Sequence, residues 1–205
     1  MPNSRAPCRV PALRYTVSAM ATAAVLLANG FEEIEALTVV DVLRRAEVQT
    51  TMVGVGARAI TGSHGITVQV DRTIDELDDE VYDVVVLPGG LPGASNLRDD
   101  ARVQALIVRQ QAEGRQLAAI CAGPIALAKA GVLAGRSVTS YPGFAPQLGD
   151  VDYREDDVVQ DGELVTSRGP GTALAFALTL VARLVGEEEA ADLGARMLVP
   201  SPSAD

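Results

Sequence analysis

Short apolar runs alternate with longer amphipathic segments along the chain. Residues 22–28 are apolar enough for a buried strand, and the Asn29-Gly30 turn leads into a helix that runs to about residue 46. Residues 49–55 predict a second strand. The near-continuous apolar run at 83–88 predicts a central strand of the kind that parallel sheets bury on both faces.

The second half of the chain continues this alternation. The remaining predicted elements are a hairpin at 61–70, a helical turn at 73–77, a helix at 102–113, a strand at 137–141, a hairpin at 158–167, and helices at 168–184 and 187–197. Strands that alternate with helices predict an α/β fold. We expect a helix–sheet–helix sandwich with a mostly parallel sheet, resembling flavodoxin.

Composition and charge narrow the classes of function. The chain has 205 residues, of which 48% are hydrophobic, so one domain with a sizeable core is expected. A net charge of −10 argues against nucleic acids and anionic membranes as general partners. No apolar run is long enough to cross a bilayer. The two cysteines do not suggest a disulfide framework, so we expect a reducing compartment, the cytoplasm.

Both ends of the chain differ from its middle. Residues 1–19 carry three prolines and three arginines but no acid, which indicates a leader: either a transit peptide or an upstream start before Met20. We assign residues 20–200 to one domain and 201–205 to a tail. Lys129 is the only lysine, and an acidic surface so poor in lysine suits either a high-salt cytoplasm or a GC-rich genome.

The stretch around Cys121 is the main candidate for chemistry. An apolar strand ends at Cys121 and a helix follows almost at once, with Gly123 giving room and Pro124 suited to the first helical turn. Such a strand-to-helix turn presents a nucleophile when small residues, here Ala119 and Gly123, flank it. The helix N-terminus should stabilise a thiolate. A buried cysteine that fills the core is the equally weighted alternative.

Three elements should meet at the carboxyl edge of the sheet, where doubly wound folds bind ligands: the turn before Glu35, the Gly89-Gly90 loop and the turn at Cys121. Glu35 lies in the first turn of its helix, where the helix dipole alone favours an acid; the functional interpretation is a protonated carboxyl beside a thiolate. Gly89 and Gly90 follow the central strand. The N–H groups of Gly90 and Ala122 would form an oxyanion hole.

The sequence argues against two kinds of site, one for NAD and one for zinc. Gly54 and Gly56 follow a strand, but Ala59 occupies the third glycine position of a dinucleotide fingerprint and a hairpin follows, so no NAD site is expected. His64 is the only histidine and lies at a hairpin tip, where a structural or exposed role is expected. One histidine and one core cysteine make a zinc site improbable, and we predict no metal and no cofactor.

Five segments together resemble the DJ-1/ThiJ/PfpI superfamily, and within it the DJ-1 branch. They are 27–35 (LANGFEEIE), 41–46 (DVLRRA), 82–90 (YDVVVLPGG), 118–124 (AAICAGP) and 166–172 (TSRGPGT). The resemblance covers about residues 20–200. It implies a homodimer with a flavodoxin-like, class I glutamine amidotransferase-like fold. It also implies a reactive Cys121, a protonated Glu35 hydrogen-bonded to its sulfur, and oxyanion donors at Gly90 and Ala122.

The resemblance implies glutathione-independent glyoxalase or deglycase activity, on a small aldehyde or a glycated protein. The alternative is a non-enzymatic stress sensor or chaperone in which Cys121 is oxidised to sulfinate. PfpI-type proteases carry histidine directly after the cysteine, where this chain has Ala122, which argues against a protease. Many relatives carry histidine where this chain has Tyr141, and a phenol is a poor base at neutral pH. We expect Gly89, Tyr141, Ser167 and Arg168 to line the pocket.

Overall fold

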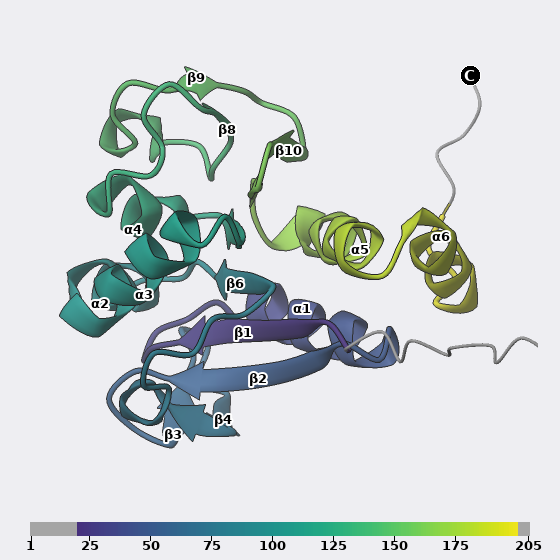
Figure 1. Ribbon diagram of the computed structural model, residues 1–205, viewed down its shortest axis with the longest axis horizontal. Helices are drawn as coiled ribbons and strands as arrows, with labels where there is room; N and C mark the ends of the chain where they lie inside the picture. The colour runs from purple at the N-terminus through teal and green to yellow at the C-terminus, as the bar shows by residue number, and fades with distance from the viewer. Residues whose placement is uncertain (1–19, 201–205) are drawn as a thin grey trace, which may run out of the picture.

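A seven-stranded sheet forms the middle layer of the protein (Figure 1). The computed structural model describes residues 20–200; the predicted leader at 1–19 and tail at 201–205 lie outside the described residues. In spatial order the strands are β10 (Val158–Asp161), β11 (Leu164–Ser167), β7 (Gln116–Ile120), β6 (Val84–Leu87), β1 (Thr22–Leu27), β2 (Gln49–Gly54) and β5 (Arg72–Thr73). Within this seven-stranded sheet only the β10–β11 pair is antiparallel, so the predicted α/β fold with a mostly parallel sheet is confirmed.

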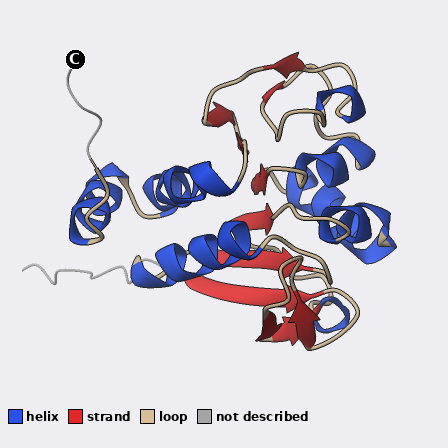
Figure 2. Ribbon diagram, turned by 180° about the vertical axis from the view of Figure 1, so that it is seen from behind, coloured by secondary structure: helices blue, strands red, loops and turns tan. Residues whose placement is uncertain are grey.

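Helices cover both faces of this sheet (Figure 2). Their bounds are α1 (Glu33–Arg45), α2 (Gly93–Asp99), α3 (Ala101–Ala112), α4 (Pro124–Lys129), α5 (Ala173–Leu184) and α6 (Glu187–Arg196). Successive residues of β1 point to opposite faces: Val25 and Leu27 pack with α1 and α5, whereas Ala24 and Leu26 pack with α2, α3 and α4. None of the helices within residues 20–200 has the length and apolar character needed to cross a membrane.

Two features differ from the sequence prediction. The strand expected at 137–141 is only β8 (Ser137–Val138), which pairs with β9 (Asp152–Tyr153) in a separate two-stranded sheet. It ends early because the amide of Thr139 donates to the side-chain oxygen of Thr166, 2.9 Å away, rather than to a strand carbonyl. Helix α2 was not predicted. The hairpin expected at 61–70 is present as β3 (Ala59–Thr61) and β4 (Thr67–Gln69).

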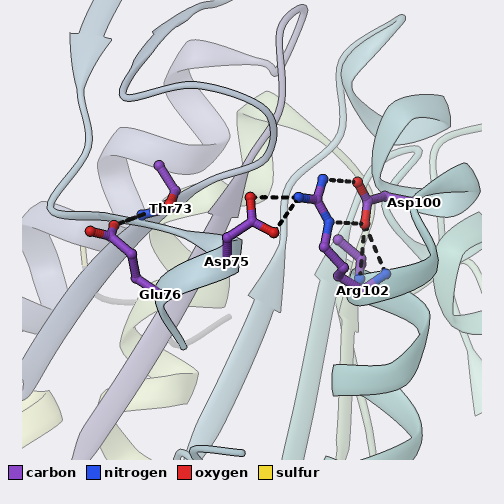
Figure 3. Close-up of polar contacts among 6 residues, drawn as sticks. Thr73, Asp75, Glu76, Asp100 and Arg102 are labelled. Carbon is purple, nitrogen blue, oxygen red and sulfur yellow. Dashed lines mark hydrogen bonds and ion pairs between the residues drawn. The ribbon is translucent and has the colours of Figure 1, made fainter. Parts of the chain in front are cut away.

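A network of ion pairs joins the short 3₁₀ helix η1 (Ile74–Glu76) to the start of α3 (Figure 3). The guanidinium of Arg102 bonds Asp75 at 2.6 Å and also pairs with Asp100. Asp100 caps α3 by accepting from the Arg102 amide at 2.9 Å, and Glu76 accepts from the Thr73 amide at 2.6 Å. Because Arg102 and Asp75 are solvent-exposed, their pair contributes about 1 kcal/mol at most.

Gln110, by contrast, is fully buried on α3. Its side-chain carbonyl accepts from the Tyr82 amide at 3.0 Å, and its amide nitrogen donates to the Tyr82 carbonyl at 2.9 Å. Both bonds satisfy the backbone just before β6, which carries the glycine loop described below. A buried polar group left without a partner costs about 1–3 kcal/mol.

We therefore expect Gln110→Ala to lower the free energy of unfolding by about 2–4 kcal/mol, because two buried backbone groups lose their partners. Urea denaturation measures this directly. Gln111→Ala, at the exposed neighbouring position of the same helix, is the matched control and should change stability by less than about 0.5 kcal/mol. Equal effects of the two substitutions would contradict this role of Gln110.

Candidate active site

Cys121 occupies a sharp turn between β7 and α4. Its φ angle is 62°, in the left-handed region that costs a non-glycine residue about 1–2 kcal/mol. Gly123 makes the turn possible, because a Cβ there would lie 2.2 Å from the Leu87 carbonyl oxygen on the neighbouring strand. Helix α4 begins at Pro124, so the turn between strand and helix is only three residues long. The thiol is partly exposed.

Backbone hydrogen bonds from two other segments hold this turn. The Cys121 amide donates to the Ser167 carbonyl at the end of β11, at 3.0 Å. The Tyr141 amide donates to the Cys121 carbonyl, also at 3.0 Å. The strained residue is thus fixed by the carboxyl end of one parallel strand and by the loop that follows β8. Strain of this kind persists only where the surroundings over-determine it, and such positions cluster at functional sites.

Glu35 lies beside Cys121 although 86 positions separate the two along the chain. Its side chain is completely buried, and one oxygen, Oε2, accepts from the Gly89 amide at 2.7 Å. A Cβ on Gly89 would lie 2.7 Å both from the Cβ of Cys121 and from Oε2 of Glu35. Only glycine therefore allows the loop after β6 to pass between the carboxyl and the thiol.

Burial raises the pKa of Glu35 to about 7, and the charge on Glu32 adds to the rise. Interaction with the Cys121 thiol and the Gly89 amide opposes the rise without cancelling it. The second oxygen, Oε1, is buried and has no well-aligned hydrogen-bond partner within residues 20–200. The Cys121 thiol interacts with this carboxyl, so the proton of either group can be shared between them.

The N-terminus of α4 does not stabilise a thiolate at Cys121 as the sequence predicted, because the pKa of this thiol is raised. Burial raises the pKa of Cys121, and the adjacent Glu35 raises it further when ionised. Hydrogen bonds from the Ala122 and Gly90 amides lower this pKa but do not outweigh burial. Helix α4 has only six residues, so its dipole is small. Because two adjacent negative charges repel, carboxyl and thiol hold at most one negative charge between them near neutral pH.

The same two amides can serve a substrate. Among the described residues, the N–H groups of Gly90 and Ala122 donate to no backbone or side-chain oxygen, and both approach the Cys121 sulfur. Gly90 has a φ angle of 83°, which glycine adopts without strain, and this conformation turns its amide toward the cysteine. The arrangement offers a nucleophile, two backbone donors and a proton carrier within one small space.

The other side chains predicted to line the pocket make contacts within neighbouring loops. The Tyr141 side chain is 48% exposed, and its ring lies against Gly169, where a Cβ would approach to 3.3 Å. The Ser167 hydroxyl bonds the Asp157 carbonyl at 2.7 Å, and Arg168 donates to the Glu155 carbonyl at 2.6 Å. These two side chains are therefore engaged within their own loops. His64 bonds Glu33 instead of approaching the cysteine.

Sequence reasoning missed one residue that shapes this site. Glu32 is the N-cap of α1, and its side chain accepts from the Glu35 amide at 2.7 Å. Serine, threonine, aspartate and asparagine are the usual caps, so a glutamate in this role cannot be predicted from residue type alone. A surface cleft of about 450 Å³ opens away from this site, beside Leu117 and Leu164 at the amino end of β7. It contains no nucleophile, so the chemistry favours the Cys121 site.

Comparisons with known proteins agree with this geometry. The sequence pattern of the DJ-1/PfpI family matches residues 21–183. Protein dj-1beta of Drosophila melanogaster is 42% identical over 181 residues, covering 87% of this chain and 97% of the relative. The crystal structure of DJ-1beta from the same organism superposes with a TM-score of 0.86 at 41% identity, covering 89% of this chain and all of that one. A deglycase of Pyrococcus horikoshii is 35% identical, over 74% of this chain and 92% of its own length.

Proposed function

The chain belongs to the DJ-1/PfpI family, and from this premise we propose that it converts reactive aldehydes, or the early adducts they form on proteins, through Cys121 and Glu35. The observation that carries the proposal is the Gly89 amide bond to Glu35, which places a carboxyl with a pKa of about 7 beside the elbow cysteine. The deglycase from Pyrococcus horikoshii supports this class of substrate. A free catalytic thiol also suits the reducing cytoplasm.

For methylglyoxal, the Cys121 sulfur attacks the aldehyde carbon while the thiol proton passes to Glu35. The carbonyl oxygen accepts hydrogen bonds from the Gly90 and Ala122 amides and is then protonated, which gives a hemithioacetal. Glu35 next takes a proton from the carbon bound to sulfur and returns one to the neighbouring carbon through an enediol. The product is a lactoyl thioester. Water cleaves it to lactate and restores the thiol, so no oxidant or reductant is consumed.

A deglycase would begin with the same attack on a different substrate. In an early glycation adduct the former aldehyde carbon carries a hydroxyl and the nitrogen of a protein side chain. Sulfur displaces that amine, which leaves with a proton from Glu35, and the resulting hemithioacetal follows the path described above. The partly exposed thiol supports access by an adduct on a protein surface. Tyr141 stands where many relatives have histidine, so this mechanism assigns all proton transfers to Glu35.

We expect Cys121→Ala to abolish lactate formation from methylglyoxal, because the nucleophile is lost, and Glu35→Gln to lower kcat/KM by about 100-fold or more. Lactate assays on the full chain measure both effects. Cys8→Ala is the matched control for the thiol, since Cys8 is the only other cysteine. Glu187→Gln is the control for the carboxyl: Glu187 also lies in the first turn of a helix, α6, which packs against α5.

The competing function is an oxidative-stress sensor or chaperone without turnover. The Gly90 and Ala122 amides beside the sulfur, together with a protonated Glu35, would equally stabilise the oxygens of a cysteine sulfinate. A folded protein that forms no lactate, but gains two oxygens selectively at Cys121 after mild peroxide, would favour the sensor. Unchanged turnover in Cys121→Ala would contradict both functions.

We also propose that the protein is a homodimer. Ile34 on α1 is 55% exposed and Ile66 is 52% exposed, and the Ile66 amide reaches the Glu33 carboxylate at 3.3 Å, so the two isoleucines lie on the same side of the protein. Most of the other apolar residues of α1 are buried within the protomer, since the helix packs on the sheet and on α5. A second copy would cover the remaining apolar surface.

Ile34→Glu should therefore convert a dimer to a monomer, because the new charge would be buried against the partner. Analytical ultracentrifugation gives the mass in solution. Val108→Glu is the matched control, because Val108 is similarly exposed, at 50%, on α3, across the sheet from α1. If both variants keep the mass of the unmodified protein, this surface is not the interface.

A further inference from the structure

Three potential metal ligands converge where α1 begins beside the loop that connects β3 and β4. Single ligand atoms from Glu32, Glu33 and His64 lie within 4.8 Å of one another. The imidazole nitrogen Nδ1 of His64 is 2.9 Å from Oε2 of Glu33 and 3.9 Å from Oε1 of Glu32. The two carboxylates are 7% and 4% exposed, whereas the His64 side chain is 70% exposed.

Each carboxylate is held in place through its other oxygen. Oε2 of Glu32 accepts from the Glu35 amide at 2.7 Å, which leaves Oε1 turned toward the imidazole. Oε1 of Glu33 accepts from the amides of His64 and Ile66, at 2.7 and 3.3 Å, which fixes Oε2 against Nδ1. Metal ligands are commonly oriented by such supporting hydrogen bonds. These oxygens are thus fixed before any ion arrives.

One of the three atoms has no partner of its own. Oε1 of Glu32 makes no hydrogen bond within residues 20–200, although its side chain is more than nine-tenths buried. Nδ1 of His64, 3.9 Å away, is too far from this oxygen for a hydrogen bond. This oxygen is an acceptor without a donor, on a side chain that is held through its other oxygen. A cation between Oε1 and Nδ1 would satisfy it.

We propose that Glu32, Glu33 and His64 bind a divalent transition-metal ion such as Zn²⁺. A tetrahedral ion with metal–ligand distances of about 2.0–2.1 Å holds its ligands about 3.3–3.4 Å apart. Nδ1 of His64 lies 2.9 Å from the Glu33 oxygen and 3.9 Å from the Glu32 oxygen, one distance shorter and one longer than that spacing. Small side-chain shifts would therefore bring the three ligands to a metal ion. The ion displaces the Nδ1 contact with Glu33, and the imidazole carries its proton on Nε2. Water fills the remaining position.

The donor set selects the class of ion. One imidazole nitrogen with two carboxylate oxygens suits Zn²⁺, Mn²⁺, Fe²⁺ or Co²⁺, whereas Ca²⁺ and Mg²⁺ prefer oxygen ligands alone. The sequence alone predicts no zinc site, because His64 and Cys121 are too few ligands; the structure instead places two carboxylates beside His64. This site uses neither the cysteine nor Glu35, and it stands independently of the proposed function. A bound ion would fasten the β3–β4 loop to the first turn of α1.

Isothermal titration of the full chain with Zn²⁺, in a Cys8→Ala/Cys121→Ala background that removes both thiols, tests the site. We expect one ion bound per chain. His64→Ala should weaken binding at least about tenfold, since even the loss of a supporting residue costs about 10–100-fold. Glu32→Gln should also weaken binding, while its side-chain carbonyl preserves the cap on Glu35. Glu187→Gln, an acid in the first turn of α6, should bind Zn²⁺ like the background protein.

X-ray absorption of the loaded protein should show only nitrogen and oxygen neighbours, with a single imidazole. Circular dichroism confirms that each variant is folded; because His64 is mostly exposed, its replacement should not affect folding. The proposal is overturned if the background protein binds no Zn²⁺ at millimolar concentration. It is also overturned if folded His64→Ala binds Zn²⁺ as tightly as the background does.

Discussion

The site depends on two backbone hydrogen bonds that hold Cys121 in a strained conformation. The Ser167 carbonyl and the Tyr141 amide bind opposite sides of the cysteine backbone, and each comes from a distant part of the chain. Without them, a residue with a φ of 62° would relax toward an ordinary strand or helix geometry. The parallel sheet supplies the Ser167 bond through the register of β11 beside β7. Sheet, loop and nucleophile therefore form one unit.

The electrostatics of the site follow from how tightly this unit is packed. Gly89 lets the loop after β6 enter between Glu35 and Cys121, and its amide fixes the carboxyl. Water is excluded from Glu35, so its carboxyl retains a proton far above its ordinary pKa. This proton allows Glu35 to act as an acid and a base beside Cys121. A carboxyl that changes protonation near neutral pH can accept a proton from the thiol or a carbon and can return it.

The sequence predicted the parts of the fold that follow local rules. The apolar runs of β1 and β6, the amphipathic α3 and the glycine–proline elbow after β7 were all apparent from residue patterns. Helix α2 was missed because it has only seven residues and Gly93, Ser95 and Asn96 favour helices weakly, so the helix depends on packing against α4. The short β8 and the raised pKa of Cys121 were missed because both depend on contacts with distant residues. The cluster of Glu32, Glu33 and His64 likewise forms only when α1 meets a distant hairpin loop.

The central claim is that Glu35 stays protonated beside Cys121 until the pH approaches neutrality. Difference infrared spectroscopy between the unmodified protein and Glu35→Gln, followed across pH, isolates the carbonyl band of this one protonated carboxyl. The account predicts that the band persists through mildly acidic pH and disappears near pH 7. A band that disappears near pH 4.5, the ordinary value for glutamate, would contradict the account.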